Sequence, residues 1–454
     1  MRYTLTITEE NEQRLRKIIF SAADKEGAAY LLCGASNSSE EIRLVVRDVV
    51  PVDAAHYLIR EVDRLSIASA SYASVAKRAQ ATGASILFVH SHPTGVPYFS
   101  VQDDREEPKL MDFFQARAPN KLHGSLMIPN GGRVVGRVWT SGGWFSLDRI
   151  RTVGTRFRFV DDGRDKEAIP EFFDRQVRAF GGDIQRLLGR LHVGIVGVGG
   201  TGSAVFEQLV RLGVGTVSVY DGEAFESSNV NRVYGSGVSN RGVAKVNIAE
   251  GNAQRIGLKT KVILHSTSIG KLETAKTLRA CDIVFGCTDK QAPRGLLVRL
   301  ALWYLIPIID IGVKVDSEEG VIRGVIGRVT VLLPGEACLF CRQRINAEII
   351  RLESLSLEEW QALADEDYAP ELEETAPAVI PFTTAAAAQG VSELLHRLTG
   401  FMGAERRSSE TLLFFHEPSI HTNRTQPSAD CLCSQQQHWG KGDRKTFLDL
   451  FWAE

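Results

Sequence analysis

A glycine-rich turn between an apolar run and an amphipathic run is the feature that most limits how this chain can fold. In the segment 193–213, VGIVGVGGTGSAVFEQLVRLG, a strand-like pattern precedes a helical one, and the turn between them holds Gly197, Gly199, Gly200 and Gly202. Glycines at such a turn let backbone N–H groups and the N-terminus of the helix face a phosphate. The segment therefore predicts a nucleotide-binding α/β fold. Dinucleotides use the same pattern, and Asp221 ends the next strand where an acid would bind a ribose, so an NAD-dependent oxidoreductase is an alternative.

The apolar runs on either side of residue 170 indicate two differently built parts of the chain. In the C-terminal part, strand-like and helical patterns alternate, as in a largely parallel sheet with crossover helices. The strand-like runs there are 193–198, 216–221, 261–266, 282–289 and 307–313. In the N-terminal part, short strand-like runs combine with a helical pattern and predict a compact α+β domain. These runs are 42–46, 85–90 and 122–129, with the helical pattern over 11–20.

A charged segment separates the two parts. Residues 161–170, DDGRDKEAIP, carry few large apolar groups and end in proline, which is typical of a linker. Because 454 residues exceed what one hydrophobic core usually contains, we expect an N-terminal domain over 1–155, a linker over 156–170 and a Rossmann-like domain over 171–454. A second charged segment, the acidic stretch 352–374, is expected to be a solvated helix or loop.

Composition argues against several classes of function. The chain has 53 Lys and Arg residues against 55 Asp and Glu residues and no long basic run, unlike a nucleic-acid-binding protein. Its first twenty residues lack the apolar core of a signal peptide, and no stretch reaches the roughly eighteen apolar residues that span a bilayer. We therefore expect a cytoplasmic protein without a nucleic-acid or membrane partner. Its seven cysteines then indicate reduced thiols or metal ligands rather than disulfides.

Two histidines at the end of a strand-like run suggest a metal site. The run 85–89 is followed by His90, Ser91 and His92, and residues i and i+2 of a strand point to the same face. Asp103, from the following turn or helix, can add a carboxylate. Three protein ligands that leave a fourth position for water are typical of catalytic rather than structural zinc. Water bound in that position is acidified to a pKa of about 7 and becomes a nucleophile.

The order of these residues resembles the H-x-H-x7-S-x2-D motif of the JAMM metallopeptidases, which cut peptide or isopeptide bonds after the C-terminus of ubiquitin or ubiquitin-like proteins. That family also has a glutamate before a strand that ends in glycine, and Glu26 precedes such a pattern here. The resemblance implies that His90, His92 and Asp103 bind a catalytic zinc ion. It also implies that Glu26 carries the proton from the zinc-bound water to the leaving amine, and that Ser100 orients or stabilises the oxyanion.

Polar residues beyond the glycine-rich turn favour ATP over NAD. They comprise Asn229 and Asn231, with Arg232, Lys245 and Asp289. Attack of a carboxylate on the α-phosphate of ATP builds negative charge, which arginine and lysine can neutralise while an aspartate holds magnesium. The set resembles the adenylating fold of ubiquitin-activating enzymes and their bacterial relatives ThiF, MoeB and HesA, over residues 171–400.

This second resemblance assigns expected roles to individual residues. It implies that Asp221 binds the ribose, that Asn231, Arg232 and Lys245 bind the phosphates, and that Asp289 holds Mg²⁺. The segment 174–176, Asp-Arg-Gln, together with Gln185, resembles the N-terminal helix whose arginine in that family reaches the ATP of a partner subunit. We therefore expect a homodimer in which Arg175 contacts the partner's nucleotide.

Four cysteines have the spacing of a structural zinc site. Cys338 and Cys341 form a CxxC pair, and Cys431 and Cys433 form a CxC pair where the family usually has a second CxxC. Four thiolates can close a tetrahedral site. His421 or His438 could replace one ligand. Buried core positions are expected for the other three cysteines, which are Cys33, Cys281 and Cys287.

Together these patterns predict a bifunctional enzyme for a ubiquitin-like protein with a C-terminal glycine. The first domain would cleave after that glycine, and the second would adenylate the exposed carboxylate. Relatives that form a thioester carry the acceptor cysteine after the first CxxC pair, but residues 342–400 contain no cysteine. We therefore expect the acyl group to pass to an external amine, sulfur donor or thiol of a conjugating enzyme. The alternatives are sulfur-carrier activation, which yields a thiocarboxylate for biosynthesis, and a binding scaffold with an inactive peptidase half.

Overall fold

The chain forms two compact units in a computed structural model that describes residues 1–22, 24–119, 121–161, 168–355, 359, 377–403 and 406–452. The first unit comprises Met1–Lys166, Trp303–Leu305 and Gln436–Thr446, and the second comprises Glu167–Leu302, Ile306–Gln435 and Phe447–Glu454. The predicted linker lies partly outside the described residues, as does most of the acidic stretch 352–374. The predicted domain limits of 1–155, 156–170 and 171–454 stay a prediction.

The first unit is built on one mixed sheet, whose strands in spatial order are β11, β10, β1, β3, β2, β6, β7, β8 and β9. Their bounds are β1 (Arg2–Thr8), β2 (Ala28–Asn37), β3 (Glu41–Pro51), β6 (Ser85–His92), β7 (His123–Pro129), β8 (Val135–Thr140), β9 (Gly143–Ser146), β10 (Arg149–Val153) and β11 (Arg158–Asp161). β1 runs parallel to β3 and β10, and β6 runs parallel to β7. A separate pair, β4 (Tyr57–Arg60) and β5 (Leu65–Ile67), is antiparallel.

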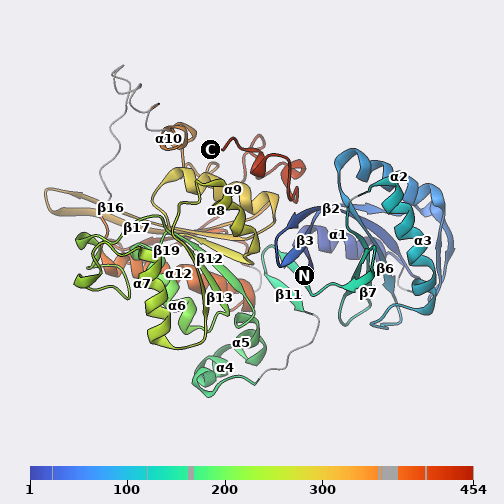
Figure 1. The fold of residues 1–454 in the computed structure, drawn as a ribbon, viewed down its shortest axis with the longest axis horizontal. Coiled ribbons are helices and arrows are strands. Elements are labelled where there is room, and N and C mark those ends of the chain that lie inside the picture. The colour runs from blue at the N-terminus through green and yellow to red at the C-terminus, as the bar shows by residue number, and fades with distance from the viewer. Residues whose placement is uncertain are drawn as a thin grey trace. The chain divides into compact units, whose positions relative to one another are not determined.

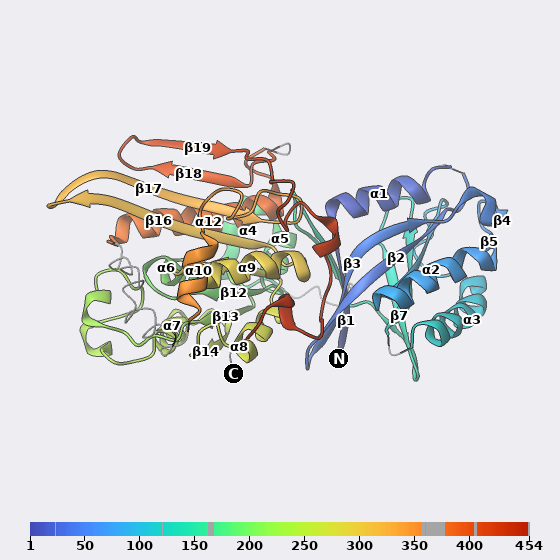
Figure 2. The same cartoon turned by 90° about the horizontal axis from the view of Figure 1, so that it is seen from above.

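Helices cover both faces of this sheet. α1 (Glu9–Ile19) lies on one face, and α2 (Ser69–Thr82) and α3 (Val101–Arg117) lie on the other (Figure 2). Alternate residues of β2 explain this arrangement, since Leu31 packs in the cluster that contains residues of α1, whereas Tyr30 packs in the cluster that contains residues of α2 and α3. The N-terminal domain is therefore α+β, as the sequence predicts.

A buried ion cluster lies on β1, β3 and β10. Glu41 accepts hydrogen bonds from Thr4 Oγ1 at 2.6 Å, Arg43 Nη2 at 2.9 Å and Arg151 Nη2 at 2.8 Å. Burial alone would raise the pKa of the Glu41 carboxyl, but Arg151 and Arg43 hold it well below its ordinary range. Glu41 therefore stays ionised inside the unit.

The second unit is an α/β structure with the strand order β14, β13, β12, β15, β16, β17, β18 and β19. The bounds are β12 (His192–Val196), β13 (Thr216–Tyr220), β14 (Lys261–His265), β15 (Ile283–Gly286), β16 (Ile308–Glu318), β17 (Val321–Leu332), β18 (Glu410–Phe414) and β19 (Ser419–Asn423). The pairs from β14 to β16 are parallel, and those from β16 to β19 are antiparallel. The sheet is therefore largely parallel and Rossmann-like, with an antiparallel extension that the sequence patterns do not predict.

Helices lie on both faces of this sheet, with α8 and α9 on one side and α6 and α12 on the other (Figure 1). The helices of the unit are α4 (Asp174–Phe180), α5 (Gly182–Leu188), α6 (Gly200–Arg211), α7 (Lys245–Ile256), α8 (Leu272–Thr277), α9 (Gln291–Trp303), α10 (Ala347–Glu353) and α12 (Ile380–Thr399). Among the described residues, no helix combines the length and the apolar character that crossing a bilayer would require. Strand order reverses between β12 and β15, and ligands of open α/β sheets bind at the carboxyl ends of such strands.

Candidate functional site

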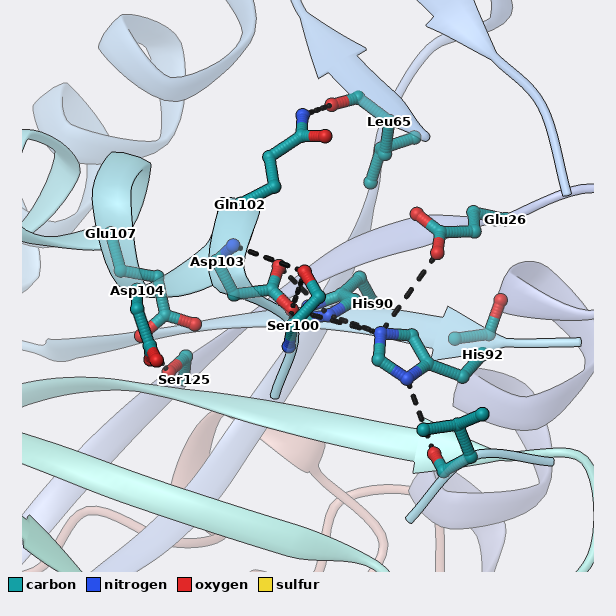
Figure 3. Close-up of polar contacts among 12 residues, drawn as sticks. Glu26, Leu65, His90, His92, Ser100, Gln102, Asp103, Asp104, Glu107 and Ser125 are labelled. Atoms are coloured by element: carbon teal, nitrogen blue, oxygen red, sulfur yellow. Dashed lines mark hydrogen bonds and ion pairs between the residues drawn. The ribbon is translucent and has the colours of Figure 1, made fainter. Parts of the chain in front are cut away.

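The end of β6 brings two histidines together on the face of the sheet that α2 and α3 cover (Figure 3). His90 Nε2 lies 3.2 Å from His92 Nε2, and both side chains are buried. Ser91, between them, points to the opposite face, where its Oγ accepts a hydrogen bond from Gly27 N at 2.9 Å. That contact fixes the residue before β2 against the end of β6. Sequence reasoning missed Ser91, although its place between the histidines puts it on the other face of the strand.

Asp103 reaches the histidines from the first turn of α3. Its Oδ1 lies 3.3 Å from His90 Nε2, and its Oδ2 lies 3.7 Å from His92 Nε2. Ser100 is the N-cap of α3, and its Oγ accepts from Asp103 N at 3.1 Å. The Asp103 carboxylate in turn accepts from Ser100 N at 2.7 Å and from Ser100 Oγ at 2.8 Å. This capping box fixes the carboxylate toward β6.

Glu26 lies beside the same group, just before β2. Its Oε1 is 3.9 Å from His92 Nε2 (Figure 3). Its main chain is held at both ends, because Glu26 N donates to Glu61 O at 2.8 Å and Glu26 O accepts from Arg60 Nε at 2.8 Å. Burial raises the pKa of the Glu26 carboxyl to about 7, although His90 and His92 oppose the shift. A carboxyl with such a pKa can both take up and release a proton near neutral pH.

The donor set suits one metal ion. One ligand atom from each of His90, His92 and Asp103 lies within 4.8 Å of the others. Two imidazole nitrogens and one carboxylate oxygen are a ligand set that catalytic zinc uses, with a fourth position open to water. These three residues therefore fit the zinc ion that the sequence motif implies.

The glycine-rich turn follows β12 at the reversal of strand order. Gly197 has φ +86°, which favours glycine, and a Cβ at this residue would lie 2.9 Å from Cys287 O. Gly200 and Gly202 begin α6, and a Cβ on Gly202 would lie 1.8 Å from Gly197 O. Gly199, the N-cap of α6, has no atom within 4 Å of its Cβ position. The turn is therefore tightly packed at Gly197 and Gly202 and open at Gly199.

Two predicted ligands lie beneath or beside this turn. Asp221 accepts hydrogen bonds from Val198 N at 2.8 Å and from Glu223 N at 2.9 Å, so its carboxylate supports the turn itself. Burial raises the pKa of the Asp221 carboxyl despite these two donors. Lys245, the first residue of α7, is buried and pairs with Glu223 Oε2 at 2.6 Å. The sequence reading missed Glu223.

The other predicted nucleotide contacts are more exposed. Arg232 packs its aliphatic stem over Gly200 and donates to Ser228 O at 2.5 Å and to Asn231 Oδ1 at 3.3 Å. Asp289 is exposed just after β15, the strand that pairs with β12. Arg175 is exposed on α4, and no hydrogen bond or ion pair among the described residues joins it to the turn.

The four predicted thiol ligands meet in the second unit. The Sγ of Cys338 lies 3.9 Å from that of Cys341 and 3.5 Å from that of Cys431, and Cys341 and Cys433 are 3.5 Å apart. Ser428 N donates to Cys341 Sγ at 3.3 Å. These four sulfur atoms fit one tetrahedral ion.

The other cysteines do not join this group. Cys33 and Cys281 are fully buried, as expected, whereas Cys287 is only half-buried beside the glycine-rich turn.

Residues 173–435 match the model of the ThiF family, and residues 8–140 match that of prokaryotic homologs of the JAB domain. The chain therefore belongs to the ThiF family and carries a JAB-like domain at its N-terminus. It is 28% identical to the molybdopterin-synthase adenylyltransferase of Escherichia coli over 180 residues, which cover 39% of this chain and 69% of that protein.

Two eukaryotic proteins match shorter stretches. The adenylyltransferase and sulfurtransferase UBA4 of Meyerozyma guilliermondii is 26% identical over 128 residues, 28% of this chain and 30% of that protein. The ubiquitin-like modifier-activating enzyme 5 of Gallus gallus is 29% identical over 166 residues, 33% of this chain and 39% of that protein. The chain thus spans well under half the length of either relative. Among solved structures, E. coli MccB with ATP is similar over 60% of this chain and 76% of that one, with 17% identity and a TM-score of 0.46.

Proposed function

We propose that this chain is a bifunctional enzyme that acts on the C-terminal tail of a ubiquitin-like protein. Its JAB-like domain hydrolyses the bond after the C-terminal glycine, and its ThiF domain adenylates the carboxylate thus exposed. The convergence of His90, His92 and Asp103, with Glu26 beside them, is the observation that carries the peptidase half. The packed glycine-rich turn, with Arg232 against it, supports the adenylating half.

In the peptidase step, His90, His92 and Asp103 would hold a zinc ion, which would supply Lewis acidity to the reaction. Glu26 takes the proton of the attacking water and delivers it to the leaving amine, for which a pKa near 7 is suited. Ser100, whose Oγ already bonds to Asp103, orients the tetrahedral oxyanion. The products are a free glycine carboxylate and the released amine.

In the adenylating step, the carboxylate attacks the α-phosphate of ATP, and pyrophosphate leaves as the acyl adenylate forms. Backbone N–H groups at the start of α6 bind phosphate oxygens, since the turn is open at Gly199. Arg232, Lys245 and Asn231 neutralise or bind the phosphates, and Asp289 holds Mg²⁺. In this scheme Lys245 must exchange its contact with Glu223 for a phosphate oxygen.

The acceptor of the acyl group lies outside the chain in this proposal. A conjugating enzyme would accept it on a thiol or pass it to an amine. The similarity to an adenylyltransferase and sulfurtransferase favours a second candidate, in which a sulfur donor converts the adenylate to a thiocarboxylate. We also propose a homodimer in which Arg175, exposed on α4, contacts the nucleotide of the partner subunit.

The two steps can be tested separately on the full-length chain. The substrates are ubiquitin-like proteins that end in Gly-Gly or carry a short extension after it, incubated with zinc, ATP and Mg²⁺. Intact-mass spectrometry should show loss of the extension followed by addition of AMP. Glu26→Gln should abolish trimming but leave AMP transfer to the pre-trimmed protein, whereas Asp289→Ala should do the reverse.

The crossed pattern of these variants makes the test specific. Trimming that persists in Glu26→Gln would contradict the peptidase assignment. If no tail of this kind is trimmed or adenylated by the wild-type chain, the ubiquitin-like substrate class is wrong. A thiocarboxylate that forms on addition of a sulfur donor, without transfer to a conjugating enzyme, would select the second candidate.

A further inference from the structure

A second acidic residue of α3 faces the metal-ligand group from one helical turn away. Glu107 follows Asp103 by four residues, and residues at this spacing lie on the same face of a helix. Glu107 is only 4% exposed, although ionisable side chains are rarely buried without a role in pairing or function. The proposed reaction assigns no task to this carboxylate.

Two neighbouring strands hold one oxygen of Glu107. Its Oε2 accepts from Ser125 Oγ of β7 at 2.7 Å and from Arg137 Nε of β8 at 2.6 Å. Ser125 pairs with Phe88 on one side and with Arg137 on the other, so all three lie in one row across the sheet. His90 follows Phe88 by two residues and therefore lies on the same face.

Several buried polar atoms on or near this row have no hydrogen-bond partner among the described residues. They include Glu107 Oε1, His90 Nδ1 and Arg137 Nη2. His90 Nε2 faces Asp103, so Nδ1 is the ring nitrogen that remains for an orienting group. Glu107 Oε1 and His90 Nδ1 both belong to side chains on the face of the sheet that α3 covers.

We propose that Glu107 is the positioning carboxylate of the metal site, which orients the His90 ring through Nδ1, directly or through one water molecule. A histidine that binds a metal through one nitrogen usually donates the other N–H to a carboxylate, a carbonyl or a water, and this fixes its tautomer and ring orientation. Glu107 is not a metal ligand and does not contact substrate in this scheme. The inference rests on the proposed metallopeptidase site and adds a residue that the family motif does not contain.

Arg137 extends this arrangement to the loop before α3. Its Nη1 bonds to Asp104 Oδ1 at 2.6 Å, and its guanidinium lies 4.0 Å from the ring centroid of Phe99. Phe99 immediately precedes Ser100, the cap of the helix that carries Asp103. Arg137 therefore connects Glu107 to the start of α3, the helix that carries Asp103.

The test measures zinc affinity of the full-length chain, so it needs no substrate. Glu107→Gln keeps the size of the side chain and removes its charge. The matched control is Glu106→Gln on the same helix, whose side chain is 55% exposed and pairs with Lys109. Titration with a competing chelator reports affinity, and Asp103→Asn identifies which binding step belongs to this site rather than to the four cysteines. Cobalt substituted for zinc reports the ligand geometry through its visible spectrum.

We expect Glu107→Gln to weaken zinc binding at this site about 10- to 100-fold and to alter the cobalt spectrum, as loss of an orienting partner does in other metal sites. Glu106→Gln should change neither. Wild-type affinity and spectrum in a folded Glu107→Gln chain would overturn the inference. If that variant does not fold, Ser125→Ala replaces it; a loss of affinity in it supports the inference, and an unchanged affinity overturns it. Absence of the Asp103-dependent step from the wild-type chain would instead refute the proposed metal site itself.

Discussion

Replacing Gly202 by alanine should disrupt the glycine-rich turn after β12 by adding a single methyl group. The added Cβ would lie 1.8 Å from Gly197 O, whereas ordinary contact begins at 3.4 Å, so one of the two must move by about 1.6 Å. The obstacle is a backbone carbonyl that cannot rotate away as a flexible side chain can. Gly197 is itself held by the sheet, because Gly197 N donates a hydrogen bond to Tyr220 O at 2.8 Å. A shift of Gly197 away from the new methyl group would therefore disturb this hydrogen bond as well.

The expected loss of stability follows from this geometry. Overpacking of a close-packed site costs about 1–3 kcal/mol, and this contact belongs at the upper end because both partners are backbone-linked. Gly251 offers a matched control, since it lies in the interior of α7 and has no atom within 4 Å of its Cβ position. The same substitution there should stabilise the chain by up to about 1 kcal/mol, because alanine favours the helix over glycine.

Differential scanning calorimetry of the full-length chain, with and without ATP and Mg²⁺, measures both effects. Gly202→Ala should lower the melting temperature of one transition and abolish its rise with ATP, whereas Gly251→Ala should raise or preserve both. If Gly202→Ala melted like the wild-type chain and still gained stability from ATP, the turn would be looser than its contacts require, and a glycine at residue 202 would not be needed for phosphate binding.

Three further predictions concern charges and thiols. Glu41→Gln should cost about 3–5 kcal/mol, because it leaves the buried Arg43 and Arg151 without their counter-ion. The folded-state pKa of Glu41 is depressed, so the stability that its carboxylate provides is present above about pH 4.3 and declines as the pH falls toward the folded-state pKa. In denaturant titrations, the free energies of unfolding of the wild-type chain and of Glu41→Gln should therefore converge in acid. Cys341→Ser should remove one zinc ion per chain by elemental analysis, and an unchanged zinc content would refute the tetrathiolate site. Asp289→Ala should abolish ATP–pyrophosphate exchange while shifting stability by no more than about 0.5 kcal/mol, because the side chain is exposed; a large fall in melting temperature would show that Asp289 has a structural role instead.

The spacing of residues in the sequence predicts those parts of the fold that depend on a single helix or strand, or on two elements that are consecutive in the chain. His90 and His92 point to one face because they are two residues apart on a strand, and the glycine-rich turn lies between consecutive elements. The helical pattern over 11–20 corresponds to α1, which begins two residues earlier at Glu9 because Thr8 caps it. Patterns of this kind need no knowledge of the rest of the chain.

Contacts between segments that are far apart in the chain cannot be predicted from local sequence patterns. Thr330 of β17 pairs with Glu410 of β18, eighty residues away, so the antiparallel extension of the second sheet depends on a pairing that no local pattern encodes. Glu107 and Arg137 likewise meet only because α3 crosses β7 and β8. In the sequence, Glu107 is one more charge on an acidic helix, and its burial is the signal that separates it from Glu106.

The capping box at the start of α3 bears on how the proposed zinc site in the first unit would bind its ion. One oxygen of Asp103 closes the helix end through Ser100, while the other faces His90. The rotamer of this ligand is thus fixed when the helix folds, so little conformational entropy remains to be lost when an ion arrives. Unlike a zinc finger, which is unfolded without its metal, this unit should be assembled beforehand. Removing the metal ion, restoring it or exchanging it for another should then leave the fold of the unit and the arrangement of the ligands unchanged.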